Sequence, residues 1–196
     1  DIVLEIGAGT GNLTKELAQK AKKVIAVEKD KYLIEELNKN LADSKNIEII
    51  NEDILKFKIE KLKLNDYKVI GNIPYYLTSY LLRIVFEKWP RPRLIVLTIQ
   101  KEVAQRIMAK PPKMNLLALT VQYFSEPEII GFIPRKDFQP MPKVDSAIIK
   151  LTPKKRIENE KWRMEKNRFY KLIKALFKQP RKTILNNLRE GGLNQE

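Results

Sequence analysis

The chain has 196 residues, with 38 lysines and arginines against 24 aspartates and glutamates, so its formal net charge at pH 7 is +14. Cysteine and histidine are both absent, which excludes a disulfide framework, a cysteine–histidine zinc site, a thiol nucleophile and imidazole acid–base catalysis. The apolar fraction of 43% is ordinary for one globular domain with a substantial core. We therefore expect chemistry that uses carboxylates, amides, hydroxyls, cationic side chains, the backbone and a cofactor, without a metal.

The sequence carries no targeting signal. No apolar run approaches the roughly 18 residues that span a bilayer, and no signal peptide is present. We expect a cytoplasmic protein with no membrane partner. Because the chain starts at Asp1, inside a strand-like run and without methionine, we also expect residues upstream of it.

The positive charge is concentrated in the second half of the chain. Residues 1–98 have a net charge of +3, residues 99–196 have +11, and residues 150–196 alone have +9. This asymmetry favours a polyanionic partner such as nucleic acid, because clustered lysines and arginines release counterions from phosphate backbones. The alternative is a lysine-rich solvated surface, as in thermophilic proteins.

Short apolar runs alternate with segments of helical period along residues 1–109. The expected strands are 2–6, 24–27, 47–50, 67–70 and 94–99, and the expected helices are 12–22, 31–41, 78–86 and 102–109. On the first helix we expect Leu13, Leu17 and Ala21 on the buried face, and Thr78 or Ser79 is the expected cap of the third helix. This alternation predicts βαβ units around a mostly parallel sheet.

The pattern changes near residue 126. Residues 127–133 and 144–151 are expected to be two strands joined by the proline-rich loop 134–142, which predicts an antiparallel hairpin at the end of the sheet. Residues 153–166 are expected to be a charged linker or helix start, followed by a basic amphipathic helical region over 168–189 that breaks near Pro180. We expect a catalytic domain over residues 1–152 and a small helical domain, incomplete in this chain, over 153–196.

A glycine-rich loop stands where the first strand turns into the first helix. It contains Gly7, Gly9 and Gly11, whereas the dinucleotide fingerprint requires its third glycine one residue later, at the position of Asn12. This spacing favours a smaller nucleoside ligand such as S-adenosylmethionine (SAM). One alternative is a nicotinamide-dependent oxidoreductase. Another is a glycine-rich turn that binds no ligand.

Two carboxylates follow later strands. Glu28 ends the second strand, 21 residues after Gly7, where a carboxylate accepts hydrogen bonds from ribose hydroxyls. Asp53 follows the third strand and is placed to accept a bond from the adenine amino group. The ordered set of glycines and carboxylates, each just past a strand, favours nucleoside binding.

The tetrapeptide Asn72-Ile73-Pro74-Tyr75 follows the fourth strand and is expected to face the same crevice. The Asn72 side chain and the Ile73 carbonyl would accept both N–H bonds of an exocyclic amine, and Pro74 would stiffen the turn. Tyr75 would stack on a flipped base and stabilise positive charge. This arrangement turns the amine lone pair toward an electrophilic methyl group without a strong base. The alternative is a surface turn of the Asn-x-Pro type.

Together, these motifs resemble the ribosomal RNA adenine N6-dimethyltransferase family. The resemblance is carried by residues 5–14, 27–28, 52–53, 71–75, 100–104 and 138–147 and extends from residue 1 to about residue 190. It implies a Rossmann-like, SAM-dependent methyltransferase domain followed by a small helical domain, acting as a monomer. It also implies an upstream Gln/His-x-Phe-Leu segment that closes over SAM, and this chain contains no match to it.

Residue roles follow from the motifs and from the resemblance. Those expected to bind the cofactor are Glu5, Gly7, Ala8, Gly9, Gly11, Glu28, Lys29, Asp53, Ile54 and Asn72. Those expected to serve the target base are Asn72, Ile73, Pro74, Tyr75 and Phe138, the last as the family aromatic that stacks on the flipped adenine from the other side. Those expected to bind RNA are Arg106, Lys110, Lys113, Lys171, Lys174, Lys178, Arg181 and Lys182.

Two types within the family compete. The KsgA type dimethylates two adjacent adenosines near the 3′ end of small-subunit rRNA, and the Erm type dimethylates one adenosine of large-subunit rRNA. Residues 177–188 are similar to a segment of the KsgA type, although Pro180 replaces the usual arginine. We therefore expect small-subunit rRNA, in a pre-30S-type particle, as the partner. A non-catalytic RNA-binding factor on the same fold is a further alternative, which predicts loss of the 72–75 loop or of Glu28, and both are present.

Overall fold

The structure, a computed structural model, describes residues 1–155, 160–179 and 181–191. The strands are β1 (Ile2–Ile6), β2 (Lys23–Glu28), β3 (Ile47–Asn51), β4 (Tyr67–Asn72), β5 (Leu94–Gln100), β6 (Ser125–Ile133) and β7 (Ser146–Pro153). The helices are α1 (Asn12–Lys20), α2 (Lys31–Asn40), α3 (Thr78–Glu87), α4 (Lys101–Ile107), α5 (Leu116–Phe124), α6 (Glu160–Leu176) and α7 (Ile184–Glu190). Three 3-10 turns complete the fold: η1 (Ile59–Leu62), η2 (Tyr75–Leu77) and η3 (Arg135–Asp137).

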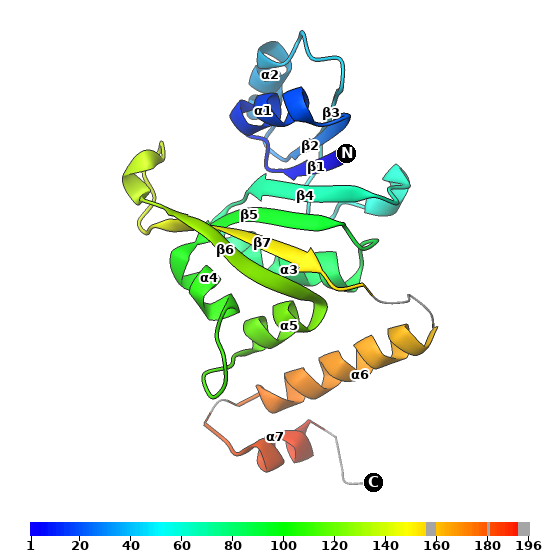
Figure 1. Cartoon of the computed structure of the whole chain (residues 1–196), viewed down its shortest axis with the longest axis vertical. Coiled ribbons are helices and arrows are strands. Elements are labelled where there is room, and N and C mark those ends of the chain that lie inside the picture. The colour runs from blue at the N-terminus through cyan, green and yellow to red at the C-terminus, as the bar shows by residue number, and fades with distance from the viewer. Residues whose placement is uncertain (156–159, 180, 192–196) are drawn as a thin grey trace.

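Seven strands form one sheet in the order β3-β2-β1-β4-β5-β7-β6 (Figure 1). Strands β1 to β5 are parallel, and β7 runs antiparallel to both β5 and β6. The expected fold class, a mostly parallel α/β sheet with a terminal antiparallel hairpin and C-terminal helices, is confirmed. The expected strands and the four expected helices before residue 110 lie within two residues of their predicted bounds.

The strand order reverses beside β1. The chain runs outward from β1 through β2 to β3, then returns to place β4 on the other side of β1. Open α/β sheets bind ligands beyond the carboxyl ends of the strands at such a reversal. Gly71 allows the close approach that this requires, because a Cβ there would lie 2.6 Å from the Ile6 carbonyl oxygen. The loops after β1 and β4 are thereby brought together.

Strands β1 and β2 are buried on both faces of the sheet, and the alternation along β2 shows which cluster covers each face. Ile25 and Val27 belong to the main core cluster, whereas Ala26 packs with Leu37 and Leu41 in a smaller cluster around α2. Helices α3, α4 and α5 contribute to the main cluster on the opposite face. This two-sided cover explains why β1 and β2 read as continuous apolar runs, whereas β5 alternates between buried and half-buried positions.

Two local predictions are wrong. On α1 the fully buried position is Thr14, while Leu13 is 36% exposed, because the inward face runs through positions 14, 17, 18 and 21 rather than 13, 17 and 21. Neither Thr78 nor Ser79 caps α3: its N-cap is Leu77, since η2 continues directly into the helix. The Thr78 hydroxyl instead donates to the Tyr75 carbonyl at 3.1 Å.

Helix α5 was not expected from the sequence. Its residues are apolar on most sides because it packs against α3, α4, β6 and α6, so no amphipathic period marks it. Asn115 was the available signal: its side chain accepts from the Ala118 N–H at 3.0 Å and caps the helix.

The C-terminal helices α6 and α7 lie at the far end of the molecule from α1 and α2 (Figure 1). An aromatic cluster joins α6 to the sheet domain, with Phe169 stacked on Tyr123 at 3.6 Å between ring centroids and Tyr170 stacked on Phe124 at 5.5 Å. The expected helical region is thus two helices, the first starting at Glu160, while the predicted break at Pro180 lies outside the described residues. The domain boundary after residue 152 stays a prediction.

The described residues include neither a membrane-spanning helix nor a cluster of metal ligands. No helix among them is both long and apolar enough to cross a membrane. Within the same residues, no group of three or more acidic side chains is arranged to hold a metal ion.

Candidate functional site

A cavity of about 680 Å³ opens at the carboxyl ends of β1, β2 and β4, beside the reversal of strand order. This volume lies within the range typical of small-molecule sites. Predicted site residues that line it are Gly7, Glu28, Lys29, Asp53, Ile54, Asn72 and Pro74. The cavity therefore brings together residues from the glycine loop, both strand-end carboxylates and the 72–75 loop.

The glycine loop is held by main-chain geometry. Gly7 has a φ of 72° and its N–H donates to the Val27 carbonyl at 2.9 Å, which pins the end of β1 to β2. Gly11 has a φ of 89°, and a Cβ there would lie 2.7 Å from a methyl carbon of Leu37. These backbone conformations favour glycine, which places no side chain at either position. Of the loop, only Gly7 lines this cavity, and the predicted cofactor residues Ala8, Gly9 and Gly11 do not.

Glu28 is 9% exposed and its carboxylate is fixed by three backbone N–H groups. Gly9 N donates to Oε2 at 2.9 Å, while Lys29 N and Asp30 N donate to Oε1 at 2.8 and 2.9 Å. A carboxylate offers about four lone-pair sites, so one strong acceptor position remains, on Oε2. The side chain thus couples the glycine loop to the end of β2 and presents a fixed acceptor to a ligand hydroxyl.

Asp53 lines the same cavity and is linked to the residue after Glu28. Its Oδ2 pairs with Lys29 Nζ at 2.9 Å, and its Oδ1 accepts from Leu55 N at 3.0 Å. The bond from Lys29, followed by that from the Leu55 N–H, lowers the pKa of Asp53 below its ordinary value. Asp53 is therefore an ionised acceptor at neutral pH, as recognition of an amino group requires.

Glu5 is buried beneath the glycine loop and does not line the cavity. Among the described residues, neither carboxyl oxygen has a hydrogen-bond partner, and the neighbouring Thr14 hydroxyl has none either. Burial raises the pKa of Glu5 to about 7, and the charge of Glu28 reinforces this; the Thr14 hydroxyl lies near enough to oppose the rise but is outside hydrogen-bond geometry. A cationic ligand near the loop would stabilise the ionised form, so this orphaned carboxyl fits a sulfonium nucleoside.

In the 72–75 loop, Asn72 and Pro74 line the cavity, while the Ile73 side chain is anchored in the core at 2% exposure. Tyr75 does not line the cavity, since its hydroxyl is hydrogen-bonded to Ser146 Oγ at 2.7 Å at the start of β7. Its neighbour Tyr76, 81% exposed, is a lining residue instead.

Phe138 is half-buried in the loop between β6 and β7 and does not line the cavity. Two tyrosines that line the cavity, Tyr32 and Tyr76, were not predicted from the sequence. Tyr32 and Tyr76 each stand close to a predicted site residue, and that proximity was the available signal for them. The roles of Tyr75 and Phe138 toward a target base stay predictions.

The eight residues expected to bind RNA come from several elements: α4, the turn after it, α6 and the segment between α6 and α7. Arg106 of α4 and Lys174 of α6 meet in a second cavity between α3, α4, α5 and α6. Lys110 and Lys113 are exposed in the turn between α4 and α5, and Lys171 is exposed on α6.

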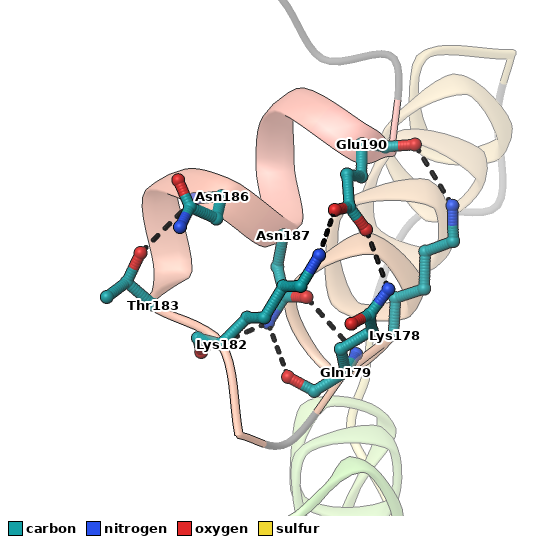
Figure 2. A network of polar contacts seen from close by, with 7 residues as sticks. All are labelled: Lys178, Gln179, Lys182, Thr183, Asn186, Asn187 and Glu190. Carbon is teal, nitrogen blue, oxygen red and sulfur yellow. Dashed lines mark hydrogen bonds and ion pairs between the residues drawn. The ribbon is translucent and has the colours of Figure 1, made fainter.

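Lys178, Arg181 and Lys182 belong to the segment between α6 and α7, and Figure 2 shows the two lysines. Glu190 Oε1 pairs with Lys182 Nζ, and the Glu190 carbonyl accepts from Lys178 Nζ at 3.1 Å. Arg181 is exposed. Two of the three expected phosphate contacts are thus engaged within the chain itself.

Asn187, 2% exposed, forms the centre of this turn. Its amide nitrogen donates to the carbonyls of Leu176 at 3.0 Å and Gln179 at 2.9 Å, and its Oδ1 accepts from Gln179 N at 3.1 Å (Figure 2). One side chain therefore satisfies backbone groups that the end of α6 leaves open.

The comparisons with known proteins agree with this geometry. The family model described as ribosomal RNA adenine dimethylase matches residues 1–196. A protein named Ribosomal RNA small subunit methyltransferase A from Dehalococcoides mccartyi (strain CBDB1) is 41% identical over 194 residues, covering 97% of this chain and 66% of that protein. A protein of the same name from Bacillus pumilus (strain SAFR-032) is 39% identical, covering 95% of this chain and 66% of that protein.

Two crystal structures are similar over most of the chain. A dimethyladenosine transferase from Plasmodium falciparum has a TM-score of 0.82 and 32% identity, covering 98% of this chain and 69% of that one. The 23S rRNA methyltransferase ErmE has a TM-score of 0.77 and 28% identity, covering 96% and 75%. This chain spans about two thirds of the length of the curated relatives described above. The resemblance predicted from the motifs is confirmed, and the chain belongs to the ribosomal RNA adenine dimethylase family.

Proposed function

We propose that this chain catalyses SAM-dependent dimethylation of N6 on two adjacent adenosines near the 3′ end of small-subunit rRNA. The observation that carries the proposal is the shared cavity of Glu28, Asp53 and Asn72 in a chain about 40% identical to proteins named for small-subunit rRNA methylation. The likeness to the ErmE structure, which acts on 23S rRNA by its name, is lower at 28% identity. The small-subunit reading is therefore preferred to the large-subunit one.

The charge of the cavity suits the proposed cofactor. Its ionisable lining residues comprise four carboxylates, from Glu28, Asp30, Glu52 and Asp53, against two lysines. Such a lining favours a ligand with a net positive charge, which a sulfonium nucleoside has. In this proposal Glu28 binds a ribose hydroxyl through its open lone pair, Asp53 accepts from the adenine amino group, and the glycine loop makes room for the methionine part.

When bound, SAM supplies an electrophilic methyl group on its sulfonium sulfur. Asn72, at the cavity wall, accepts one N–H bond of the target amine through its carboxamide oxygen, and the Ile73 carbonyl accepts the other. These bonds withdraw the nitrogen lone pair from the ring and aim it at the methyl group. The methylated amine is acidic and releases its proton to water, so the absence of histidine is no obstacle. Positioning and electrostatics supply most of the acceleration.

In the same proposal, rRNA in an assembling small subunit is the partner, a single copy of the chain acts on it, and the reaction occurs in the cytoplasm. The net charge of +11 over residues 99–196 supports binding of a polyanion by this half. Target choice then comes from RNA shape and the extruded base rather than from phosphate contacts.

The decisive experiment is incubation with under-methylated small ribosomal subunits and tritiated SAM, followed by mapping of the labelled nucleotides. We expect label on two adjacent adenosines near the 3′ end. Label confined to large-subunit RNA would instead support the Erm-type alternative, and RNA binding without any label would support a non-catalytic factor. Calorimetric titration with SAM and with NAD separates the methyltransferase from an oxidoreductase.

A further inference from the structure

A second cavity, of about 390 Å³, lies between α3, α4, α5 and α6. One stretch of chain connects it to the first: Pro74, Tyr76 and Leu77 line the cofactor cavity, whereas Ser79, Tyr80, Leu82 and Arg83 line the second. At 1.5 Å of rise per helical residue, Leu77 and Arg83 are about 9 Å apart along the helix axis, so the two linings follow each other along the first turns of α3. A ligand that occupies both cavities would therefore be a short stretch of one extended molecule.

The second cavity contains a buried polar atom without a partner. Tyr170 of α6 is 8% exposed and lines the cavity. Among the described residues its hydroxyl has no hydrogen-bond partner. Burial raises the pKa of Tyr170 above its ordinary value, so the group remains a neutral phenol able to donate and to accept. Buried polar groups are nearly always paired, which makes this hydroxyl a position where a ligand edge is expected.

Cations from three helices surround the same cavity. Arg83, Arg106 and Lys174 come from α3, α4 and α6, and Glu87, which pairs with Arg83 at 2.9 Å, is the one acid in the lining. Arg106 and Lys174 are exposed, and Arg83 is about half exposed, so all three can reach solvent-side groups of a ligand. The balance of charges favours an anion at the mouth of the cavity.

The remaining lining offers flat and apolar surfaces. Tyr80 is 49% exposed and Leu116 is 40% exposed, whereas Leu82 and Ile173 form a buried floor. An aromatic ring beside aliphatic side chains is the usual environment of an unstacked nucleobase. The cavity thus combines a surface for a base, a polar atom for its edge and cations for its phosphates.

We propose that this cavity binds a nucleotide of the RNA substrate a few positions from the methylated adenosine. The base lies between Tyr80 and the leucines of α5, its edge hydrogen-bonds to the Tyr170 hydroxyl, and its phosphates contact the three cations. The inference rests on the proposed RNA substrate and adds a second base-binding position that fixes which nucleotide enters the cofactor cavity. A free mononucleotide has the same chemistry and is the alternative source to be tested.

The test compares two tyrosines with buried hydroxyls. Tyr170→Phe removes the hydroxyl without a partner, and Tyr67→Phe removes one that donates to the Pro90 carbonyl. Binding to an unmodified transcript of the 3′ region of small-subunit rRNA is measured without SAM, and thermal unfolding is measured on the same samples. We expect Tyr170→Phe to weaken RNA binding about three- to tenfold with an unchanged or higher melting temperature. Tyr67→Phe should lower the melting temperature and leave RNA affinity unchanged.

Unchanged RNA affinity in Tyr170→Phe would overturn the proposal. So would saturable binding of adenosine 5′-monophosphate that depends on Tyr170 while RNA binding does not. A matched pair on α6 checks the cations: Lys174→Ala should weaken RNA binding more than Lys171→Ala, and equal effects would indicate diffuse charge rather than a pocket. Because RNA binding is read without SAM, a failure of methylation in the unaltered chain would refute the proposed function separately.

Discussion

The two cavities of this molecule have opposite charge and different construction. The cofactor cavity has four carboxylates against two lysines and is shaped by strand ends and backbone N–H groups, three of which fix Glu28. The second cavity has three cations against one carboxylate and is shaped by side chains from four helices. If the proposed function holds, a cationic nucleoside and the phosphates of an RNA would be separated by electrostatics as well as by position.

Because one cavity is built from strand ends and the other from helix side chains, the two depend on the rest of the fold in different ways. Backbone groups at the ends of buried parallel strands are positioned by the sheet itself, so the cofactor cavity needs few side chains to be correct. The cations of the second cavity are exposed, and their helices are positioned by packing that includes the aromatic cluster of Tyr123, Phe124, Phe169 and Tyr170. Changes at the first site should alter chemistry, and changes at the second should alter RNA binding.

The largest expected effect is that of Asn72→Ala, which tests this separation at the catalytic loop. Removing the carboxamide takes away an acceptor for the target amine, and loss of one such preorganised group typically lowers kcat about 10²- to 10³-fold. The glycine loop and Glu28 network are untouched, so SAM affinity should stay within about threefold. Single-turnover methylation and calorimetry measure the two quantities. Methylation by the variant at close to the unaltered rate would contradict the role assigned to Asn72.

Glu5→Gln tests, through the pH dependence of stability, whether the buried carboxyl next to the glycine loop is protonated. Because the pKa of Glu5 is raised from 4.5 to about 7, the folded chain keeps a proton in this range that the unfolded chain has released. The contribution of Glu5 to stability therefore decreases as pH rises from 4.5 through 7, by about 3 kcal/mol in total. The glutamine variant should match the unaltered chain near pH 4.5 and be more stable above pH 7. Denaturant unfolding at several pH values measures this, and parallel pH profiles would refute it.

The same contrast explains what the sequence could predict. Glu28 and Asn72 end their strands and Asp53 follows one, and the carboxyl ends of parallel strands share one edge, so their meeting in one cavity follows from chain order. The second cavity depends on α5. This helix is apolar on most sides, so its sequence shows no helical period and did not predict it. Tyr75 and Tyr76 are adjacent, and only the bond to Ser146 determines which of them turns away from the cofactor cavity. The pairing of Glu190 with Lys178 and Lys182 likewise required the folded turn.

Asn187→Ala tests whether the turn between α6 and α7 supports RNA binding. Its side chain bonds to backbone groups at Leu176 and Gln179, and leaving such buried groups unpaired costs about 1–3 kcal/mol. We expect faster amide exchange in α7 and weaker RNA binding, with SAM affinity unchanged. Asn186→Ala is the matched control, since the exposed Asn186 side chain makes no bond among the described residues. Equal effects of the two variants would contradict the role of Asn187.

Glu190→Gln should have the smallest effect of these variants, and it should raise RNA affinity where Asn187→Ala lowers it. Removing the carboxylate charge weakens the contacts that occupy Lys182 and Gln179, and leaves more positive charge available beside the exposed Arg181. RNA affinity should rise about two- to threefold, with a steeper dependence on salt, because each additional phosphate contact releases further counterions. Glu165→Gln, an exposed change on α6 with no ion pair among the described residues, removes the same charge without freeing a lysine. If both variants raise affinity equally, the gain comes from net charge alone, and Glu190 does not restrain the basic turn.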